Sequence, residues 1–516
     1  MSKLIQDTLE RLSTSHDNAR IWDDSQGRWF THNELLVRTG QLATWLGKEH
    51  VQKGERVLVA GSNTFAFVTA YLGVILSGRV AVPVHADATQ HEWSRLMEQS
   101  EAKAAVVTVD TENGDALCRE ASMHHLPYIR VGADGVLLGC PLMATSKNSG
   151  FAYEIDDEAA AVMLFTSGTT GRPKGVTLSH RIMRANADNV IRSHALTDAD
   201  TAYCFLPLFH INAQVVVLWS TLLSGGQLIL QRKFSARRFW STIAANQITW
   251  VSAVPAIITI LLQTSGPVST TTLRFVRSAS APLPANTLRQ FEQRFGIPVI
   301  ESYGMTEAAS QICVNPLPPQ PRKAGSVGLP YGVELKVVND QFETLPPNET
   351  GEIALRGQSV ISEYAGGAGA DSFVDGWFLT GDIGYRDNDG YVYLVARKKE
   401  LINRAGEKVS PREIEEVLLT HANVKQAAVI GVPDAVLGER IVAYVTVHQA
   451  MLVSDMRESL NKICLELLSK FKRPSEICIV EQLPTGATGK IQRLRLRQEI
   501  LKQQDTEKNV HTISST

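Results

Sequence analysis

Ten consecutive residues have the composition of a phosphate-binding loop. They read Thr166-Ser167-Gly168-Thr169-Thr170-Gly171-Arg172-Pro173-Lys174-Gly175 and follow directly on the apolar run AAVMLF. Backbone amides, hydroxyl groups and one ammonium in such a segment can surround the oxygens of a polyphosphate. Because Pro173 and Gly175 flank the lysine, the segment is not the G-x-x-x-x-G-K-[ST] nucleotide loop. It therefore predicts a phosphate site of another kind, with a plain flexible turn as the alternative.

Further short motifs with polar or charged residues follow in order along the chain. Each has a plain interpretation when taken alone: an aspartate in a turn, a lysine on the surface, a histidine packed in the core. The motifs are LPLFHINA with His210, Ser278-Ala279-Ser280-Ala281-Pro282-Leu283, Tyr303-Gly304-Met305-Thr306-Glu307, Thr380-Gly381-Asp382, Arg397, and PTGATGK ending at Lys490.

In this order the motifs resemble those of the adenylate-forming superfamily, which includes acyl- and aryl-CoA synthetases, peptide-synthetase adenylation domains and firefly luciferase. The resemblance spans nearly the whole chain. The stretches LPLFHINAQ and KFSARRFW are similar to bacterial carnitine/crotonobetaine–CoA ligases. The resemblance to the superfamily implies that ATP converts a carboxylic acid to an acyl-adenylate, and that coenzyme A then accepts the acyl group as a thioester. AMP and pyrophosphate are the other products, and Mg²⁺ is required.

The resemblance implies four catalytic residues. Two anions must meet when a carboxylate approaches the α-phosphate, and their repulsion at ~4 Å is about 4 kcal/mol at an effective dielectric constant of about 20. The ammonium of Lys490 would bridge them, and Thr306 would donate a hydrogen bond to the α-phosphate. Glu307, with Thr166, would bind Mg²⁺ together with phosphate oxygens. His210 would shape the acyl pocket and its closure.

The resemblance also implies a set of residues around ATP. The ring of Tyr303 would pack on adenine, and Asp382, supported by Arg397, would accept hydrogen bonds from the ribose hydroxyls. The whole implied set is Thr166, Ser167, Gly168, Thr169, Thr170, Gly171, Lys174, Ser280, Ala281, Pro282, Ser302, Tyr303, Gly304, Met305, Thr306, Asp382, Arg397 and Lys490. Ala279 and Ser280 replace the family's usual glycine pair, which predicts a less close approach of the backbone to adenine.

The acyl pocket is the least determined part of the site. Its candidates are His210, Asn212, Gln214, Val254, Ser278 and Ala281. These side chains are small or polar and include no obvious cation for a second carboxylate, so they predict a short or medium acid with a polar group. The stretch Phe209-His210-Ile211-Asn212 lacks the aspartate that binds the substrate ammonium in α-amino-acid adenylation domains. A phosphopantetheinyl carrier protein remains an alternative acceptor to coenzyme A.

A charged stretch after residue 396 is identified, through the resemblance, as a hinge. Rotation about Lys399 would withdraw Lys490 and bring Gly406 toward the site, where the absence of a side chain leaves a passage for pantetheine. Asn403 stands where the family usually has a lysine, so the assistance of that lysine in the second step is in doubt. The predicted domains are residues 1–396, which bind AMP, and residues 397–516, a mobile lid.

Segments of strand and helix period alternate through most of the chain and predict the α/β class. The predicted architecture is a large N-terminal domain of layered α/β subdomains with a β-rich subdomain, and a small α+β C-terminal domain. The expected elements are helices over 33–50, 65–78 and 456–468, a helix beginning near His180, a helix PREIEEVLLTH with Pro411 in its first turn, strands RVLVAG, VAVPV, AAVVTV and AAVMLF, and a β-rich stretch over 328–393.

Composition excludes several classes of protein. The 516 residues carry 51 Lys and Arg against 53 Asp and Glu, so charge does not indicate a nucleic-acid partner. Six scattered cysteines form no disulfide or zinc pattern, and the chain starts without the apolar core of a secretory signal. The uncharged stretch 211–231 contains polar residues and a glycine pair, which predicts a buried helix and strand and no membrane insertion. We therefore expect a cytoplasmic protein.

Overall fold

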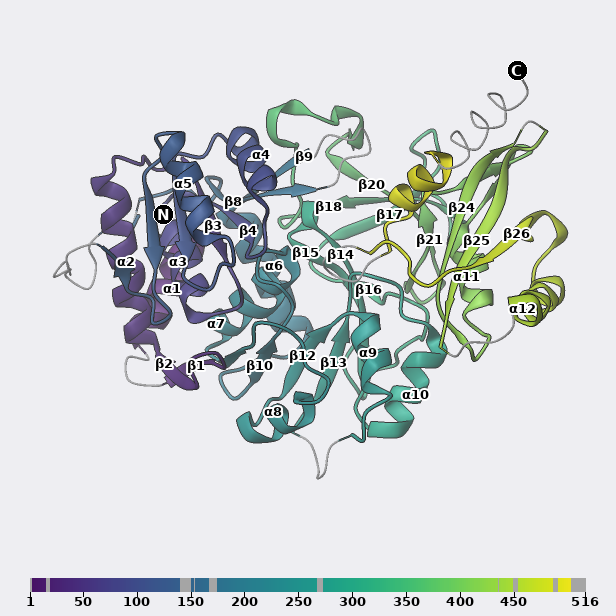
Figure 1. The fold of residues 1–516 in the computed structure, drawn as a ribbon, viewed down its shortest axis with the longest axis horizontal. Coiled ribbons are helices and arrows are strands. Elements are labelled where there is room, and N and C mark those ends of the chain that lie inside the picture. The colour runs from purple at the N-terminus through teal and green to yellow at the C-terminus, as the bar shows by residue number, and fades with distance from the viewer. Residues whose placement is uncertain are drawn as a thin grey trace, which may run out of the picture. The chain divides into compact units, whose positions relative to one another are not determined.

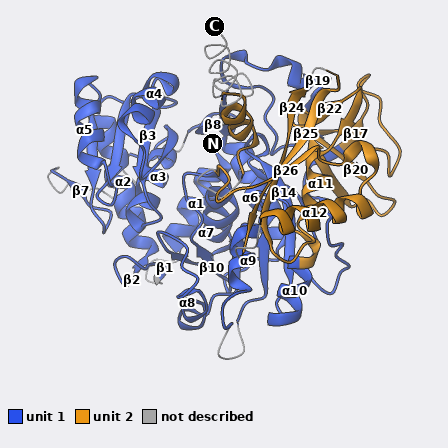
Figure 2. Ribbon diagram, turned by 45° about the vertical axis from the view of Figure 1, so that its right-hand side comes forward, with its two compact units in different colours: residues 1–283, 287–335, 355–378 blue, residues 284–286, 336–354, 379–516 orange. Residues whose placement is uncertain are grey.

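The computed structural model describes residues 2–14, 19–139, 150–152, 154–166, 174–266, 272–434, 436–448, 453–485 and 491–502 (Figure 1). The chain divides into two compact units, which are residues 1–283, 287–335 and 355–378, and residues 284–286, 336–354 and 379–516 (Figure 2). Sheets and helices are layered in the larger unit, and a smaller sheet with helices forms the end of the chain. The predicted α/β class is confirmed.

A seven-stranded sheet forms one layer of the larger unit, in the order β7-β6-β5-β3-β4-β8-β9. The strands β3 to β6 and β8 pair in parallel, whereas β7 and β9 are antiparallel edges. The strands are β3 (Arg56–Gly61), β4 (Val80–His85), β5 (Ala104–Thr108), β6 (Tyr128–Val131), β7 (Leu137–Leu138), β8 (Ala160–Thr166) and β9 (Lys174–Ser179), and the helices between and before them are α1 (Lys3–Thr14), α2 (His32–Lys48), α3 (Phe65–Leu76), α4 (Gln90–Ser100) and α5 (Gly114–Met123).

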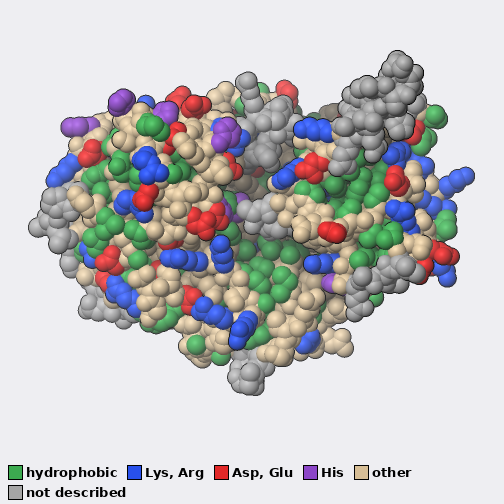
Figure 3. Space-filling model, viewed as in Figure 1, with side chains coloured by type: hydrophobic (Ala, Val, Ile, Leu, Met, Phe, Trp, Pro, Cys, Tyr) green, Lys and Arg blue, Asp and Glu red, His purple; other side chains and the backbone are tan. Residues whose placement is uncertain are grey.

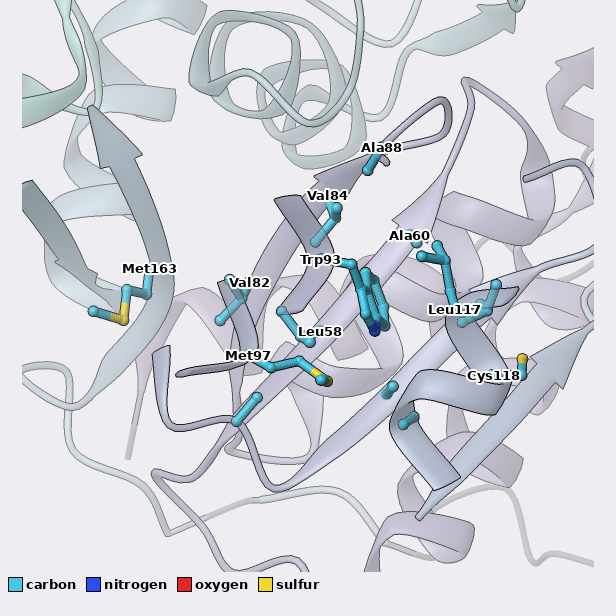
Figure 4. Close-up of a cluster of buried hydrophobic side chains, with 14 of the residues drawn as sticks. Leu58, Ala60, Val82, Val84, Ala88, Trp93, Met97, Leu117, Cys118 and Met163 are labelled. Atoms are coloured by element: carbon cyan, nitrogen blue, oxygen red, sulfur yellow. The ribbon is translucent and has the colours of Figure 1, made fainter. Parts of the chain in front are cut away.

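One face of this sheet is covered by α4 and α5 (Figure 4). Trp93 of α4 is fully buried and lies among Leu58, Val84 and Leu117. Both α2 and α4 begin with a capping box, in which a threonine and a glutamate three residues later satisfy each other's backbone amides. These local signals explain where α4 and α2, the helix expected over 33–50, begin in the structure.

A nine-stranded sheet forms the second layer, in the order β16-β15-β14-β13-β12-β10-β11-β1-β2. The strands from β1 to β14 along this order pair in parallel, and the pairing becomes antiparallel beyond β14 and at β2. The elements are β1 (Ala19–Asp23), β2 (Arg28–Thr31), α6 (His180–Ser193), β10 (Thr201–Cys204), β11 (Gln227–Leu230), α8 (Phe239–Asn246), β12 (Trp250–Ala253), α9 (Pro255–Leu261), β13 (Phe275–Ser278), α10 (Ala285–Phe295), β14 (Val299–Met305), β15 (Ser310–Val314) and β16 (Leu329–Pro330).

The uncharged stretch 211–231 is a buried helix followed by a strand, as predicted. It comprises the π-helical η1 (Asn212–Trp219), α7 (Ser220–Ser224) and β11, and Gly225 and Gly226 separate the helix from the strand. In the described residues, no helix has the length and apolar character to cross a membrane. The five cysteines that fall within these residues are free thiols.

A third sheet contains the expected β-rich stretch. Its strands run in the order β17-β18-β20-β19, with β21 paired to β20. They are β17 (Glu334–Val338), β18 (Gly351–Arg356), β19 (Phe373–Val374), β20 (Trp377–Arg386) and β21 (Val392–Arg397), and three short 3₁₀ turns, η2 (Thr306–Ala308), η3 (Ala365–Gly367) and η4 (Ala370–Ser372), occur in the same part of the chain.

The last sheet, β23-β22-β25-β24 with β26 beside β25, lies wholly in the smaller unit. Its core joins apolar side chains of the strands to those of α11 and α12. Pro411 occupies the first turn of α11, as predicted, where its missing amide hydrogen is not needed. The elements are β22 (Ile402–Arg404), β23 (Glu407–Val409), α11 (Pro411–Leu418), β24 (Val424–Asp434), β25 (Gly438–Val447), α12 (Val453–Leu467), η5 (Lys470–Lys472) and β26 (Glu476–Ile479).

Candidate active site

The glycine- and threonine-rich segment joins two antiparallel strands. Thr166 at the end of β8 pairs with Lys174 at the start of β9, so these residues are the base of a hairpin. The segment thus leads into a strand, whereas the G-x-x-x-x-G-K-[ST] loop leads into a helix. Ser167, Gly168, Thr169, Thr170 and Gly171, with the side chain of Thr166, lie outside the described residues.

Lys174 and Glu307 both contact Tyr364, the lysine at the ring and the glutamate at the hydroxyl. The ammonium of Lys174 lies 4.5 Å from the centroid of the Tyr364 ring, and the hydroxyl of Tyr364 donates a hydrogen bond of 3.0 Å to Glu307 Oε1. The backbone approaches closely here as well, since a Cβ on Gly369 would lie 2.3 Å from Lys174 Nζ. Glu307 is buried, and the amide of Ile361 donates to its carbonyl oxygen (2.9 Å). A tyrosine far along the chain therefore holds the carboxylate and packs against the lysine.

The YGMTE motif lies at the end of β14 and in η2. A β-bulge between Tyr303 and Gly304 re-aims the strand where it pairs with β15. Only glycine fits at residue 304, because a Cβ there would lie 1.6 Å from the carbonyl oxygen of Ser310. The amide of Asn186 on α6 donates to the carbonyl oxygens of Ala308 (2.9 Å) and Gln311 (2.7 Å). Tyr303 is buried, whereas Met305 and Thr306 are half-buried.

The donor set suits Mg²⁺ that is held mainly by phosphate oxygens and water. No group of three or more His, Cys, Asp or Glu side chains in the described residues is arranged to hold a metal ion. Glu307 is one buried carboxylate close to the base of the loop hairpin. Mg²⁺ in nucleotide enzymes usually has one or two protein carboxylates, so Glu307 fits this ion.

Asn212, Ser252, Arg277 and Ser280 form a polar cluster at the carboxyl ends of three parallel strands. Arg277 Nη1 donates to Asn212 Oδ1 (3.3 Å) and to Ser252 Oγ (3.2 Å). Ser252 Oγ donates to Asn212 Oδ1 (3.3 Å), and Asn212 Nδ2 donates to Ser280 Oγ (3.4 Å). Ligands of parallel α/β sheets bind at this edge. The structure thus brings two predicted residues, Asn212 and Ser280, together with two that the sequence analysis did not select.

Ser278, Val254, Ala281 and Pro282 lie beside this cluster along the chain. Ser278 ends β13 and is fully buried, and Val254 follows β12 as the residue before α9. Ser280 has a left-handed backbone (φ 73°), a conformation that glycine adopts at lower cost. The loop therefore keeps the backbone shape for which glycine is suited, with a hydroxyl directed to Asn212.

His210 packs against Phe209, with ring centroids 3.9 Å apart, and His85 contacts the edge of the same phenylalanine at 4.6 Å. Burial, and secondarily the charge of His85, lowers the pKa of His210 to about 4. The imidazole is therefore neutral near pH 7. Gln214 lies elsewhere, in the core, where its Oε1 accepts a hydrogen bond from the Tyr71 hydroxyl (3.0 Å).

Asp382 and Arg397 are direct partners in the smaller unit. They pair across β20 and β21, and Arg397 Nε lies 2.6 Å from Asp382 Oδ1. The carboxylate is buried, and the hydroxyl of Thr380 accepts a hydrogen bond from the Asp382 amide (3.0 Å). Thr380 itself donates to the carbonyl oxygen of Ile353 (2.9 Å). The TGD motif is thus an ordered strand segment, and its aspartate has a fixed orientation.

The expected hinge residues follow directly on β21. Lys398 pairs with Glu352 (2.8 Å) and Asp340 (3.4 Å), which raises its pKa, whereas Lys399 is exposed. Gly406 lies in the turn between β22 and β23, and a Cβ there would meet no atom within 4 Å. The amide of Asn403 donates to Glu439 Oε2 (2.8 Å). Lys490 lies outside the described residues.

The hairpin base, the tyrosine-held carboxylate and the ordered TGD strand together agree with an AMP-forming acid–thiol ligase. A family model described as AMP-binding enzyme matches residues 10–365, and one described as AMP-binding enzyme C-terminal domain matches residues 413–490. The chain belongs to the family of AMP-binding enzymes.

Relatives of known function align over almost the full length. Sulfoacetate–CoA ligase of Cupriavidus necator is 37% identical over 93% of this chain and 94% of that protein. Oxalate–CoA ligase of Arabidopsis thaliana is 37% identical over 97% and 99%. The structure of o-succinylbenzoate coenzyme A synthetase from Bacillus subtilis with ATP and magnesium has a TM-score of 0.82 at 28% identity, over 95% and 98%.

These matches confirm several predictions from the sequence. The fold is that of adenylate-forming enzymes, with a large N-terminal and a small C-terminal part. The chain is an ATP-dependent acid–thiol ligase that uses Mg²⁺ and coenzyme A. The nearer resemblance is confirmed as well, since crotonobetaine/carnitine–CoA ligase of Salmonella paratyphi A is 30% identical over 93% of this chain and 95% of that protein.

Four residues at the site were missed, namely Tyr364, His85, Ser252 and Arg277. Nothing in the spacing of the sequence relates Tyr364 to Glu307, or His85 to Phe209, because only the fold brings them together. Arg277 did have a signal. It is a lone charge in the buried strand FVRS, directly before the motif that the sequence analysis selected.

Proposed function

We propose that this site joins a short polar carboxylic acid to coenzyme A through an acyl-adenylate, with the residues selected from the sequence in the roles expected there. The contact that supports this assignment most is the link from Lys174 through Tyr364 to Glu307. It places a cation and a buried carboxylate together at the base of the glycine- and threonine-rich segment, where a polyphosphate and its Mg²⁺ would bind.

In the first step the acid carboxylate attacks the α-phosphorus and pyrophosphate leaves. The backbone of residues 167–171, with Lys174, binds the β- and γ-phosphates, and Thr306 orients the α-phosphate. Glu307 and Thr166 would hold Mg²⁺, which would supply positive charge to offset that of the phosphates. Asp382, paired with Arg397, orients the ribose. The ring of Tyr303 on β14 packs against adenine, which lies between this strand and the Ser280–Pro282 loop. Lys490 brings the two anions together.

In the second step the thiol of coenzyme A attacks the acyl carbonyl and AMP leaves. We propose that the boundary between the two functional domains lies between residues 396 and 397, and that the smaller domain rotates about Lys399. Rotation withdraws Lys490 and brings Gly406 to the site, where open space around its Cα leaves room for the pantetheine chain. One site then performs two reactions in turn.

The relatives support a small, polar acid. Two of the relatives reported above are named for sulfoacetate and oxalate. Both are two-carbon acids with a second anionic group. The neutral His210 and the hydroxyl-bearing Ser278 and Ser280 suit such a substrate better than a long hydrocarbon chain. We propose a cytoplasmic location, where the reducing environment suits the free thiols of the described cysteines.

The test is a two-stage assay on the full chain. Pyrophosphate release is measured with ATP, Mg²⁺ and a panel of short and long carboxylic acids, and thioester formation is then followed by mass spectrometry with coenzyme A or with a phosphopantetheinyl carrier protein. We expect release with short polar acids and a thioester with coenzyme A. Activity with very long chains only, or transfer to the carrier alone, would contradict the proposal.

A further inference from the structure

Arg277 is a cation in the interior of the larger unit. It lies on β13 between two parallel neighbours, paired in register with Ser252 of β12 and Ile300 of β14, and only 1% of its surface is exposed. Burial lowers its pKa to about 9, so it still carries its charge near pH 7. A buried guanidinium is costly unless its charge and its donors are satisfied.

The partners of Arg277 do not neutralise it. Nη1 donates to two neutral oxygens, Asn212 Oδ1 and Ser252 Oγ. Nε is buried without a hydrogen-bond partner, and no carboxylate of the described residues lies at ion-pair distance from the guanidinium. The nearby His194 is itself kept neutral, since burial and then the charge of Arg277 lower its pKa to about 3. The described surroundings therefore leave a positive charge without a counter-ion.

Two other arginines, the buried Arg79 and the half-buried Arg493, show how this chain satisfies the donors of such a group. Arg79 donates to the carbonyl oxygens of Val51 and Ser77 through all three of its nitrogen atoms. Arg493 pairs with Glu415 (2.5 Å) and Glu400 (3.3 Å). Both have structural partners that satisfy them, and Arg277 does not.

The place of Arg277 is the edge of the sheet where the predicted acyl pocket lies. Its partner Asn212 is half-buried and in turn donates to Ser280, which is exposed. The orientation of the Asn212 amide is decided by Arg277, because the reverse orientation would set donor against donor. Asn212 is also the first residue of η1, whose N-terminal amides add positive potential. The guanidinium of Arg277, the Nδ2 group of Asn212 and the first amides of η1 therefore supply donors and positive potential for an anion.

We propose that Arg277 binds a second anionic group of the acid substrate and so restricts the enzyme to short dianionic acids, in which a carboxylate or sulfonate lies a few bonds from the carboxylate that is activated. The inference rests on the proposed function and names its substrate class. The ligand supplies the missing counter-charge, and an acid without a second anion leaves the guanidinium buried and unpaired.

The test compares acids of matched length in the pyrophosphate-release assay. The pairs are malonate with propionate, sulfoacetate with acetate, and oxalate with glycolate. We expect wild-type kcat/KM to favour the dianion of each pair by about 100-fold. Arg277→Met, which keeps the length of the side chain, should lower kcat/KM for the dianions by about 100-fold, mainly through KM, so that the preference over the matched monoanions is lost, and leave KM for ATP within about threefold.

Arg274→Met is the matched control. Arg274 directly precedes the same strand but pairs with Asp200 (2.5 Å), so its replacement should leave the preference for dianions unchanged. A wild-type enzyme without that preference, or an Arg277→Met variant that keeps it, would overturn the inference while the ligase activity stands.

A binding measurement decides the inference independently of turnover. With the non-cleavable α,β-methylene analogue of ATP present, malonate should raise the thermal unfolding midpoint of the wild-type chain and not that of Arg277→Met. Equal shifts in the two proteins, or none in either, would count against Arg277 as the anion site. If no acid gave pyrophosphate release, the proposed function would fail, and this comparison would still test the role of Arg277.

Discussion

At the residue scale, three residues selected for the proposed site are each held by a neighbouring polar side chain. Arg397 orients Asp382, Tyr364 orients Glu307, and Arg277 orients Asn212. Each contact restricts a side chain that would otherwise sample several rotamers, and such preorganisation is a main source of catalytic power. The supporting residues therefore deserve the same mutational tests as the residues that they support.

Tyr364→Phe removes only the hydroxyl that donates to Glu307 Oε1. We expect kcat/KM for ATP to fall about tenfold, which corresponds to about 1.4 kcal/mol and is typical of one hydrogen bond to a charged group. The Mg²⁺ concentration for half-maximal rate should rise at the same time, because Glu307 is less firmly held. Initial rates over a magnesium titration measure both effects. Tyr128→Phe, at an exposed residue of β6, should change neither, and an unaltered magnesium response in Tyr364→Phe would contradict this role.

At the element scale, the site lies where regular strands end. Parallel pairing from β10 to β14 aligns the carboxyl ends of β12 and β13, so the residues that follow them lie beside η1. Beyond β14 the pairing becomes antiparallel, and the bulge at Gly304 marks this change next to the residues Thr306 and Glu307. The change in pairing thus occurs at the YGMTE motif, which we propose binds the nucleotide.

Gly304→Ala tests the importance of that bulge. The added Cβ would lie 1.6 Å from Ser310 O, so β14 or β15 must shift. We expect a loss of stability of about 3 kcal/mol and a clearly weaker affinity for ATP, measured by urea denaturation and by equilibrium binding. Gly47→Ala in α2, where the Cβ meets no atom within 4 Å, is the control and should be neutral or stabilise by up to about 1 kcal/mol. Normal ATP binding by Gly304→Ala would show that the strands can shift without affecting ATP affinity, and would contradict this role of the bulge.

At the scale of the whole molecule, acidic and basic residues nearly balance in number, and the larger unit contains buried neutral histidines. On the face drawn in Figure 3, acidic and basic side chains are interspersed, in agreement with the net charge of −2. Burial is the main cause that lowers the pKa of four histidines. The pKa falls to about 4 for His32, His180 and His210, and to about 3 for His194.

These histidines should make the larger unit sensitive to acid. Their pKa values are below the unfolded value of about 6.5, so the unfolded chain binds more protons between pH 6.5 and 4, and stability falls as the pH falls through this range. At pH 5.5 each should cost about 1.4 kcal/mol relative to neutral pH. Urea denaturation at pH 7.5 and 5.5, followed by tryptophan fluorescence, measures this unit selectively because all eight tryptophans belong to it.

A single substitution tests whether the buried histidines cause this acid sensitivity. His194→Gln should reduce the loss of stability between pH 7.5 and 5.5 by about one quarter, because it removes one of the four contributions. His91→Gln, at an exposed residue of α4, should leave the loss unchanged. A pH response that is identical in all three proteins would attribute the acid sensitivity to other groups.

The proposed rotation of the smaller domain separates the two half-reactions. Lys490→Ala should lower pyrophosphate release by at least about 100-fold, because the repulsion between the two anions is no longer offset. Thioester formation from a supplied acyl-adenylate should remain within about threefold of wild type. Both rates are measured by separating nucleotides and thioesters chromatographically. Equal loss of both steps would contradict the model in which Lys490 is withdrawn before the second step.

The sequence by itself determined the class of the fold, the family and the order of the nucleotide-binding motifs. Periodicity and capping residues act over a few positions, which is why α2, α3, β3 and α11 could be predicted closely. Contiguous motifs such as YGMTE carry their chemistry in adjacent residues. The same holds for the glycine- and threonine-rich segment, although its residues 167–173 and Lys490 lie outside the described part of the chain.

Only the tertiary structure decided which side chains contact the proposed site residues and where the buried Arg277 lies among them. Tyr364 reaches Glu307 across 57 residues, and Arg277 reaches Asn212 across 65, distances at which no local pattern connects two residues. The sequence indicated no cation that could bind a second carboxylate. The fold places Arg277 in contact with Asn212, which is a residue of the predicted acyl pocket. Strand pairing and burial bring such residues together, and both arise from packing of the whole sheet rather than from neighbouring residues in the chain.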